Sequence, residues 1–428
     1  MQGEADMSSV AILFIILVAL IIVGVPIGVA IGVATMAGLI ADGMPIIWFS
    51  QKLFNTFDSF PLMAVPFFLF AGDIMQHGTL SKNLLGLCQV FVGHLRGGLA
   101  QISTLTCLFY GTLCGSAPAT TAAIGGFMIP AMEQEKYPRT FAAAVNSASG
   151  VLGVMIPPSV PLILYGASGM VSITDLFIAG VLPGLLVCLA FMITSNIICR
   201  RKGYGIIHEK SPWKTRLRAL WGAKYAIMVP VIVLGFIYTG ICTPTEAGAV
   251  ACAYALFIET FVTRCMTLKL LHKIMSSSLR TLSMIFLMII TAGAMGTFLQ
   301  LHAMDRFIID LVHGFTSSPA MFMFLMLILF LIIGTFMDCA ATILILAPML
   351  VPLAKSFGID PVHFGIFMLV SLSLGFLTPP VGVNLFVGCS LSDIPLMTLS
   401  RAVLPYIVAM LIVLLLIMYV PAISLLLL

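Results

Sequence analysis

The sequence predicts an all-helical, multi-pass membrane protein built from two inverted-topology repeats. Of the 428 residues, 61% are hydrophobic and only 8% are charged, whereas a soluble domain carries about 25% charged residues. Apolar stretches long enough for a membrane-spanning helix, about 20 residues, recur along the chain. A block of motifs also returns after a shift of 222 residues. The composition excludes a disordered chain, a nucleic-acid-binding domain and a secreted disulfide scaffold.

Ten apolar stretches are predicted to cross the lipid bilayer. They lie near 8–23, 25–42, 57–76, 140–170, 174–198, 225–242, 246–263, 281–300, 362–392 and 402–424. Two of them, 140–170 and 362–392, exceed a single span and carry Pro-Pro near the centre, which predicts broken helices. The N-terminus contains Glu4 and Asp6 but no basic residue. We therefore expect the first stretch to be a retained span and not a cleaved signal peptide.

Two further apolar stretches, 98–132 and 319–354, are predicted to be re-entrant hairpins. Small and polar residues interrupt the first at 115–121 and the second at 334–342. Two half-length helices joined by such a tip enter and leave on the same side of the membrane. Backbone of this kind is tolerated at membrane depth only where protein or a water-filled cavity surrounds it. The segments that precede the hairpins, 78–97 and 300–318, mix charged and apolar residues and are expected to lie along the interface.

The basic residues predict the orientation. With the N-terminus outside and each hairpin returning to its own side, 17 of the 20 Lys and Arg residues are cytoplasmic, and only Lys52, Arg306 and Lys355 are not. Cytoplasmic loops of membrane proteins carry such an excess. Both termini are then periplasmic. The loop 200–224 holds eight basic residues, which we interpret as an orientation signal in preference to a lipid or partner site.

The internal repeat divides the chain into two halves, 1–199 and 225–428, with 200–224 as a basic linker. A shift of 222 residues aligns Thr120 with Thr342 and Pro157-Pro158 with Pro379-Pro380. Each half holds five spans and one hairpin, and because five is odd the second half is inverted. Inverted repeats whose broken helices meet at the midplane are typical of secondary transporters.

The Pro-Pro breaks and hairpin tips predict cation sites. Pro157 lacks the amide hydrogen that the carbonyl of Gly153 would accept, and Pro379 does the same to Gly375. A dehydrated cation can satisfy such buried carbonyls, and oxygen ligands suit a hard cation such as Na⁺. The candidate sodium ligands are Gly115, Ser116, Thr120, Gly153, Gly334, Asp338, Thr342, Gly375, Thr378 and Asn384.

The half-helices that follow the tips and breaks point amide donors inward and can receive a carboxylate. The candidate substrate contacts are Ser116, Pro158, Ser159 and Pro380. Small polar residues are also common at ordinary helix contacts in membranes, so packing is the alternative for each of them. An acid inside an apolar hairpin is costly, which favours a functional role for Asp338. Glu246 is expected to cap the helix that begins beside it.

Four segments resemble one family. They are Gly115-Ser116-Ala117-Pro118-Ala119-Thr120-Thr121, Met155-Ile156-Pro157-Pro158-Ser159, Leu377-Thr378-Pro379-Pro380-Val381-Gly382-Val383-Asn384 and Phe60-Pro61-Leu62-Met63-Ala64-Val65-Pro66-Phe67-Phe68. Together they are similar to the large membrane subunit of tripartite ATP-independent periplasmic (TRAP) transporters. The resemblance extends over nearly the whole chain.

The resemblance implies sodium-driven import of an organic-acid anion, of the sialic acid or C4-dicarboxylate class, across the bacterial inner membrane. It implies a periplasmic substrate-binding protein and a small four-span membrane subunit, which we expect to be a separate chain. It also implies an elevator motion of the hairpins and broken helices, and no cofactor. The alternatives are a stand-alone sodium-coupled dicarboxylate carrier or antiporter of related architecture, or, from another class, a membrane enzyme or channel. No catalytic constellation in the sequence favours an enzyme.

Overall fold

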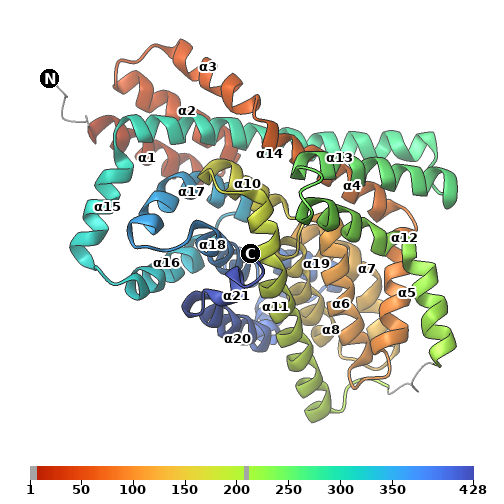
Figure 1. Cartoon of the computed structure of the whole chain (residues 1–428). Helices are drawn as coiled ribbons and strands as arrows, with labels where there is room; N and C mark the ends of the chain where they lie inside the picture. The colour runs from red at the N-terminus through yellow and green to blue at the C-terminus, as the bar shows by residue number, and fades with distance from the viewer. Residues whose placement is uncertain (1–6, 207–211) are drawn as a thin grey trace.

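A computed structural model describes residues 7–206 and 212–428, and within this part the chain is helical throughout, with no strand (Figure 1). The acidic residues Glu4 and Asp6, and Lys210 of the basic linker, lie outside the described residues. The prediction of an all-helical protein is confirmed.

The described part of the first half forms eleven α-helices and one 3-10 helix. They are α1 (Met7–Ile22), α2 (Ile27–Ala41), α3 (Ile46–Phe57), η1 (Phe60–Met63), α4 (Ala64–His77), α5 (Leu80–Val92), α6 (Gly98–Cys114), α7 (Ala117–Gln134), α8 (Arg139–Gly150), α9 (Leu152–Met155), α10 (Val160–Gly169) and α11 (Ile173–Lys202). The interruption between α6 and α7 falls inside the predicted hairpin tip. The interruption between α9 and α10 falls at the predicted Pro-Pro break.

The described part of the second half forms ten α-helices and a short π-helix. They are α12 (Trp213–Tyr238), α13 (Pro244–Phe257), η2 (Ile258–Val262), α14 (Leu268–Leu301), α15 (Met304–Phe315), α16 (Pro319–Gly334), α17 (Cys339–Ser356), α18 (Pro361–Gly375), α19 (Val383–Ser392), α20 (Leu396–Tyr419) and α21 (Ala422–Leu425). Glu246 completes a capping box with Thr243 at the start of α13, as expected.

The structure departs from the predicted boundaries where a helix leaves the apolar core. The predicted span 57–76 is joined to α3, which the hydropathy pattern missed, and the two parts meet at 60°. Helices α12 and α14 start before the predicted 225 and 281, because basic residues continue a helix without hindrance once it lies outside the hydrocarbon. Six described helices are long and apolar enough to cross a membrane, or up to nine if each bent pair is one span.

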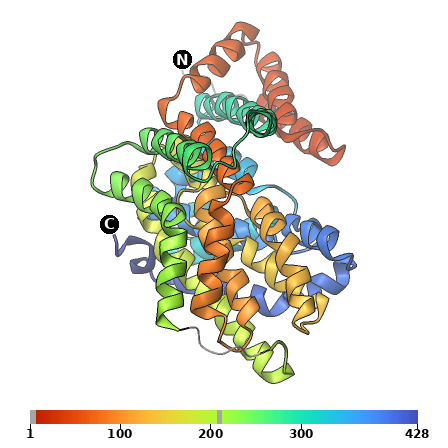
Figure 2. The same cartoon turned by 90° about the vertical axis from the view of Figure 1, so that its right-hand side faces the viewer.

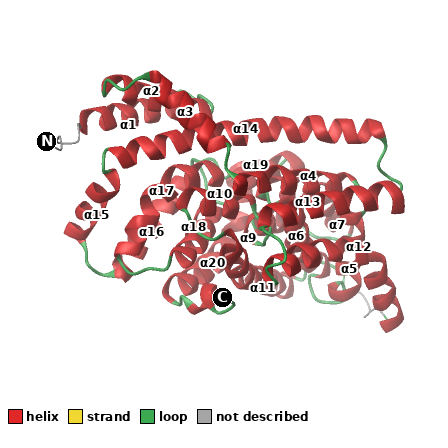
Figure 3. Ribbon diagram, turned by 45° about the horizontal axis from the view of Figure 1, so that its top comes forward, coloured by secondary structure: helices red, strands yellow, loops and turns green. Residues whose placement is uncertain are grey.

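The helices pack in two groups. In one, α14 runs along α2 and α3, α1 packs on α2, and α4 packs on α13 (Figures 1 and 2). In the other, α7 and α19 pack on α8, α17 packs on α10, and α16 packs on α18. Helices α6 and α7 lie against each other, whereas α16 and α17 share few contacts and diverge from their tip. The groups meet where α4 contacts α6 and where α14 contacts α17. Short loops connect most of the helices (Figure 3).

A buried carboxylate fixes the start of α5. Glu259, in η2, is fully buried, and its Oε1 accepts hydrogen bonds from the amides of Thr79 (2.8 Å) and Leu80 (3.0 Å). These amides are among the helix-terminal donors that have no partner within the helix. A Cβ on Gly78 would lie 2.1 Å from the same oxygen, so a larger residue there would displace the carboxylate from its capping position. An acidic group from η2 thus caps a helix about 180 residues earlier in the chain.

We predict that Glu259→Ala destabilises the protein. The substitution leaves the amides of Thr79, which is partly buried, and Leu80, which is buried, without their acceptor. An unsatisfied buried donor costs about 1–3 kcal/mol, so the thermal unfolding temperature in detergent should fall clearly. Glu133→Ala is the matched control. Its partly exposed ion pair with Arg139, 3.4 Å long, should contribute less than about 1 kcal/mol. Equal unfolding temperatures for the two variants would contradict the capping role.

Candidate functional site

The first hairpin tip is a tight turn between α6 and α7. Gly115 ends α6 with φ +62°, a left-handed conformation that glycine adopts without strain. Ser116 has an extended backbone and precedes α7, in whose first turn Pro118 lies. The hydroxyl of Thr120 donates to the carbonyl of Ser116 at 2.8 Å. Thr120 is fully buried, so its hydroxyl holds the turn.

The first break lies between Met155 and Val160, and the peptide bond Pro157-Pro158 is cis. Neither proline can donate an amide hydrogen to the carbonyls of Gly153 and Val154. The hydroxyl of Ser159 takes that role for Val154, at 2.5 Å. Ser159 is fully buried. Its hydroxyl is therefore engaged with the backbone, which is the packing alternative to the predicted substrate contact.

The tip and the break touch backbone to backbone. A Cβ on Gly111 would lie 2.7 Å from the Cα of Gly153, and a Cβ on Gly153 would lie 2.4 Å from Thr120 Oγ1. Distances under 3.0 Å do not occur for real Cβ atoms without a shift of the neighbour. Three residues of the predicted site, Ser116, Thr120 and Gly153, are therefore brought together.

The second tip and break have a similar arrangement. The carboxylate of Asp338 caps α17 by accepting from the amide of Ala340 at 2.9 Å, and the hydroxyl of Thr342 donates to the carbonyl of Asp338, also at 2.9 Å. A Cβ on Gly375 would lie 2.3 Å from the carbonyl carbon and oxygen of Gly334. The amide of Val381 donates to the carbonyl of Thr335 at 3.3 Å, which ties the tip to the break. The peptide bond Pro379-Pro380 is also cis.

The carbonyl of Gly375 in the second predicted cation site differs from the prediction. The carbonyl of Gly375 was expected to be free, but it accepts the amide of Thr378 at 3.0 Å, because the chain turns directly after α18. The hydroxyl of Thr378 donates to the carbonyl of Leu374 at 3.1 Å. Each carbonyl keeps a second lone pair, so these contacts leave acceptor capacity at the break.

Asn384 points toward α8. Its Nδ2 donates to the carbonyl of Ser147 at 3.1 Å. Its Oδ1 is buried and, within the described residues, has no hydrogen-bond partner. A buried amide oxygen of this kind is costly unless a further ligand satisfies it, so it retains the capacity to bind a cation.

Both hairpin tips face one cavity of about 380 Å³. Of the predicted residues, Gly115, Ser116 and Asp338 line it, with Pro118, Val160 and Phe376 around them. Asp338 is exposed there and not buried in the hairpin. The other predicted residues, Thr120, Gly153, Pro158, Ser159, Gly334, Thr342, Gly375, Thr378, Pro380 and Asn384, do not line this cavity.

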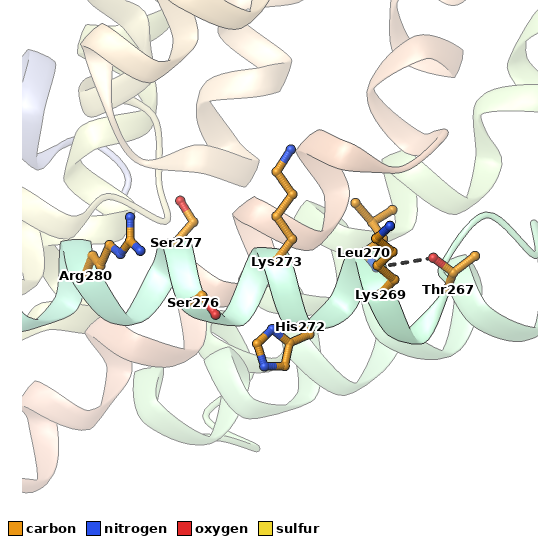
Figure 4. A pocket seen from close by; sticks show the side chains of 8 residues that line it. All are labelled: Thr267, Lys269, Leu270, His272, Lys273, Ser276, Ser277 and Arg280. Atoms are coloured by element: carbon orange, nitrogen blue, oxygen red, sulfur yellow. Dashed lines mark hydrogen bonds between the residues drawn. The ribbon is translucent and has the colours of Figure 1, made fainter.

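The cavity has a further wall, formed by one face of α14, which was not predicted from the sequence. Arg280, Thr281, Met284, Ile285 and Met288 line it. Their spacing follows the helical repeat. The pattern that could have predicted this wall is a basic residue at the start of a mostly apolar helical face. Arg280 had been assigned only to the orientation of the chain. The preceding turns of α14, from Thr267 to Arg280, line another, more open space (Figure 4).

Comparison with known proteins points to one family for the chain. The family model described as "Tripartite ATP-independent periplasmic transporter, DctM component" matches residues 14–423. The chain is 43% identical over 94% of its length to an isethionate TRAP transporter permease protein, DctMQ, of Oleidesulfovibrio alaskensis, of which it spans 64%. It is 40% identical to the C4-dicarboxylate TRAP transporter large permease protein DctM of Pseudomonas aeruginosa, with 87% of each chain covered.

Two further proteins are similar in sequence or fold. The chain is 36% identical to the sialic acid TRAP transporter large permease protein SiaM of Vibrio cholerae, with 91% of each chain covered. The structure matches the Alcanivorax borkumensis YdaH transporter with a TM-score of 0.68 and 14% identity over 97% of this chain and 98% of that one, a likeness of fold. Because the relatives are named as transporter permeases, the prediction that the chain is not an enzyme is confirmed.

We predict that Gly375→Ala impairs folding or transport. Its Cβ would meet the backbone of Gly334, which cannot move aside as a flexible side chain could, and overpacking of this kind costs about 1–3 kcal/mol. Gly126→Ala is the control, because that helical glycine has open space around its missing Cβ. The yield of folded protein in detergent and its unfolding temperature measure the difference. A Gly375→Ala protein as stable as Gly126→Ala would show that the contact is looser.

Proposed function

Because this chain belongs to the DctM family of tripartite ATP-independent periplasmic transporters, we propose that it is the large membrane subunit of a sodium-coupled importer of an organic-acid anion. The small membrane subunit and the periplasmic binding protein, on which members of this family depend, complete the transporter. We place it in the inner membrane, with both termini periplasmic.

The names of the relatives support the substrate class. They transport isethionate, C4-dicarboxylates and sialic acid, which share an acidic group that is ionised at neutral pH. We propose that this chain takes an acid of the same kind. Amide donors at the start of α7, next to the cavity, suit such an anion, because no side chain caps that helix.

The single observation that carries the proposal is the cavity into which both hairpin tips face. Ser116 and Asp338 occupy corresponding positions of the two repeats and line the same space. Each is followed by a threonine that holds its turn, at 2.8 Å and 2.9 Å. We propose that the tips and the carbonyls at the breaks bind sodium beside the substrate, and that the hairpins and broken helices move together in an elevator motion.

Asp338 is the strongest candidate sodium ligand. Its carboxylate is exposed in the cavity, and in residues 7–206 and 212–428 it has no Lys, Arg or His nitrogen within 4.0 Å. A hard oxygen ligand with a full negative charge favours a small cation. The hydroxyl and carbonyl oxygens of Ser116 supply uncharged ligands at the other tip.

We predict that Asp338→Asn weakens sodium-dependent uptake at least about tenfold, because it removes a charge-assisted contact worth about 1.5–3 kcal/mol. The measurement is uptake of succinate, N-acetylneuraminate or isethionate into proteoliposomes that hold the chain with its small subunit and binding protein, at several sodium concentrations. Asp393→Asn is the control. The Asp393 side chain is 86% exposed, and asparagine tolerates the left-handed backbone of that position.

Two outcomes would contradict the proposal. Uptake without any sodium dependence in the wild type would exclude sodium coupling. Uptake that survives removal of both partner proteins would favour a stand-alone carrier of similar fold. If Asp338→Asn has an unchanged sodium dependence, Asp338 is not a sodium ligand. The sodium site would then be assigned to the first tip, where Ser116→Ala is the corresponding variant.

A further inference from the structure

We propose that Arg280 binds the acidic group of the substrate opposite the hairpin tips, and that the basic face of α14 from Arg280 to Lys269 lines its route to the cytoplasm. The proposal rests on the proposed function and adds to it the anion-binding residue and the release route.

Arg280 lines two cavities. One is the cavity of about 380 Å³ that both tips share, and the other, about 740 Å³, is an open space over the first half of α14, whose lining residues all lie between Thr267 and Arg280. The two cavities have Arg280 in common, so this residue marks the place where they adjoin. Lys269 and Lys273 line the second cavity together with Ser276 and Ser277.

The charges at this junction are not neutralised by the protein itself. Across the described residues, Arg280 has no carboxylate oxygen within 4.0 Å. Asp338, which lines the same cavity, has the amide of Ala340 as its hydrogen-bond donor and no basic partner. One cavity therefore presents an unpaired cation on α14 and an unpaired anion on a hairpin tip. A carboxylate substrate and a sodium ion complement these two charges.

Arginine fits the task by its shape. Its planar guanidinium holds five donors in a fixed fork that matches a carboxylate or a similar acidic group in a bidentate contact. Arg280 is exposed, so its donors are accessible from the cavity. The apolar residues that follow it on the same wall, Met284 and Ile285, reduce competition from water and strengthen the charge interaction.

The lysines extend the positive charge along one side of the helix. Lys273 follows Lys269 by four residues and precedes Arg280 by seven, which places the three on one face. Lys273 and Arg280 rise from the same side of α14 in Figure 4. A groove lined by charges of one sign raises the local concentration of the opposite ion. Flexible lysines hold an anion less firmly than a bidentate arginine, which suits release.

Anionic lipid headgroups are the competing ligand, because basic residues at the cytoplasmic end of a span attract them. The junction with the tip cavity favours the substrate. A lipid site needs no contact with the space between Ser116 and Asp338, yet Arg280 lines that space.

The test compares Arg280→Gln, Arg280→Lys and Lys273→Gln with the control Arg401→Gln in the complete transporter. Arg401 is an exposed cation of α20 that lines neither cavity. Uptake of succinate, N-acetylneuraminate and isethionate is measured in vesicles of phosphatidylcholine alone and with phosphatidylglycerol. We expect Arg280→Gln to raise KM about tenfold or more, Arg280→Lys to recover part of that loss, Lys273→Gln to slow release a few-fold, and Arg401→Gln to match the wild type.

A second measurement separates charge recognition from structure. The wild type should be inhibited by the acid it transports far more strongly than by the neutral amide of that acid, and Arg280→Gln should lose most of this preference. If Arg280→Gln fails to fold, Arg280→Lys carries the same measurement.

Three results would overturn the proposal. The first is an Arg280→Gln variant whose KM, and whose preference for the acid over its neutral amide, equal those of the wild type. The second is a defect that appears only in vesicles with phosphatidylglycerol, which would identify a headgroup site. The third is an equal defect in Arg401→Gln, which would reduce the effect to general surface charge. A wild type that takes up no acid of the panel would count against the proposed function and not against Arg280 alone.

Discussion

The contact on which the site depends is the approach of two backbones without side chains between them. Gly111 meets Gly153 in the first half, and Gly334 meets Gly375 in the second. At distances this short a single added methyl group would force the hairpin and the broken helix apart. Each hairpin tip is consequently held by the helix that it faces, and the polar turn is set at a fixed depth. Ser116 and Asp338, which lie at the tips that these contacts hold, both line the cavity.

Hydroxyl groups then add hydrogen bonds to the backbone at the two turns, and at the first break one of them replaces a bond that a proline removes. Thr120 and Thr342 bond the carbonyls at the two tips, and Ser159 bonds the carbonyl of Val154 at the first break. Buried carbonyls at membrane depth need such partners. These residues therefore have two separate roles. Threonines and serines behind the tips hold the backbone, and the two residues at the tips are left to face the cavity.

Much of this arrangement could be predicted from the sequence. Gly115, Pro157-Pro158 and Pro379-Pro380 are local signals, since a left-handed turn and a missing amide follow from residue type alone. The close contacts between tips and breaks agree with the motifs that recur after 222 residues. Arg280 could not be found this way, because a cation near a span boundary has the same pattern whether it orients the chain or lines a cavity. Helix α3 was not predicted because its polar residues lower the mean hydropathy of the segment. Its packing on α14 is a tertiary contact, which the hydropathy pattern does not contain. The roles of Thr378 and Ser159 depend on how the chain turns after each break, which no spacing rule gives.

The length of α14 sets a constraint on the membrane around it. At 1.5 Å per residue, 34 residues give a rod of about 51 Å, against a hydrocarbon core of about 30 Å. To immerse the whole rod, the helix would have to lean about 54° from the bilayer normal, beyond the 0–40° that transmembrane helices show. Part of the rod must therefore emerge from the hydrocarbon, and its apolar C-terminal half is the part that suits the lipid. The turns that bear Lys269 and Lys273 belong to the other half, so the local thickness of the membrane sets how much of this basic stretch reaches the headgroup layer.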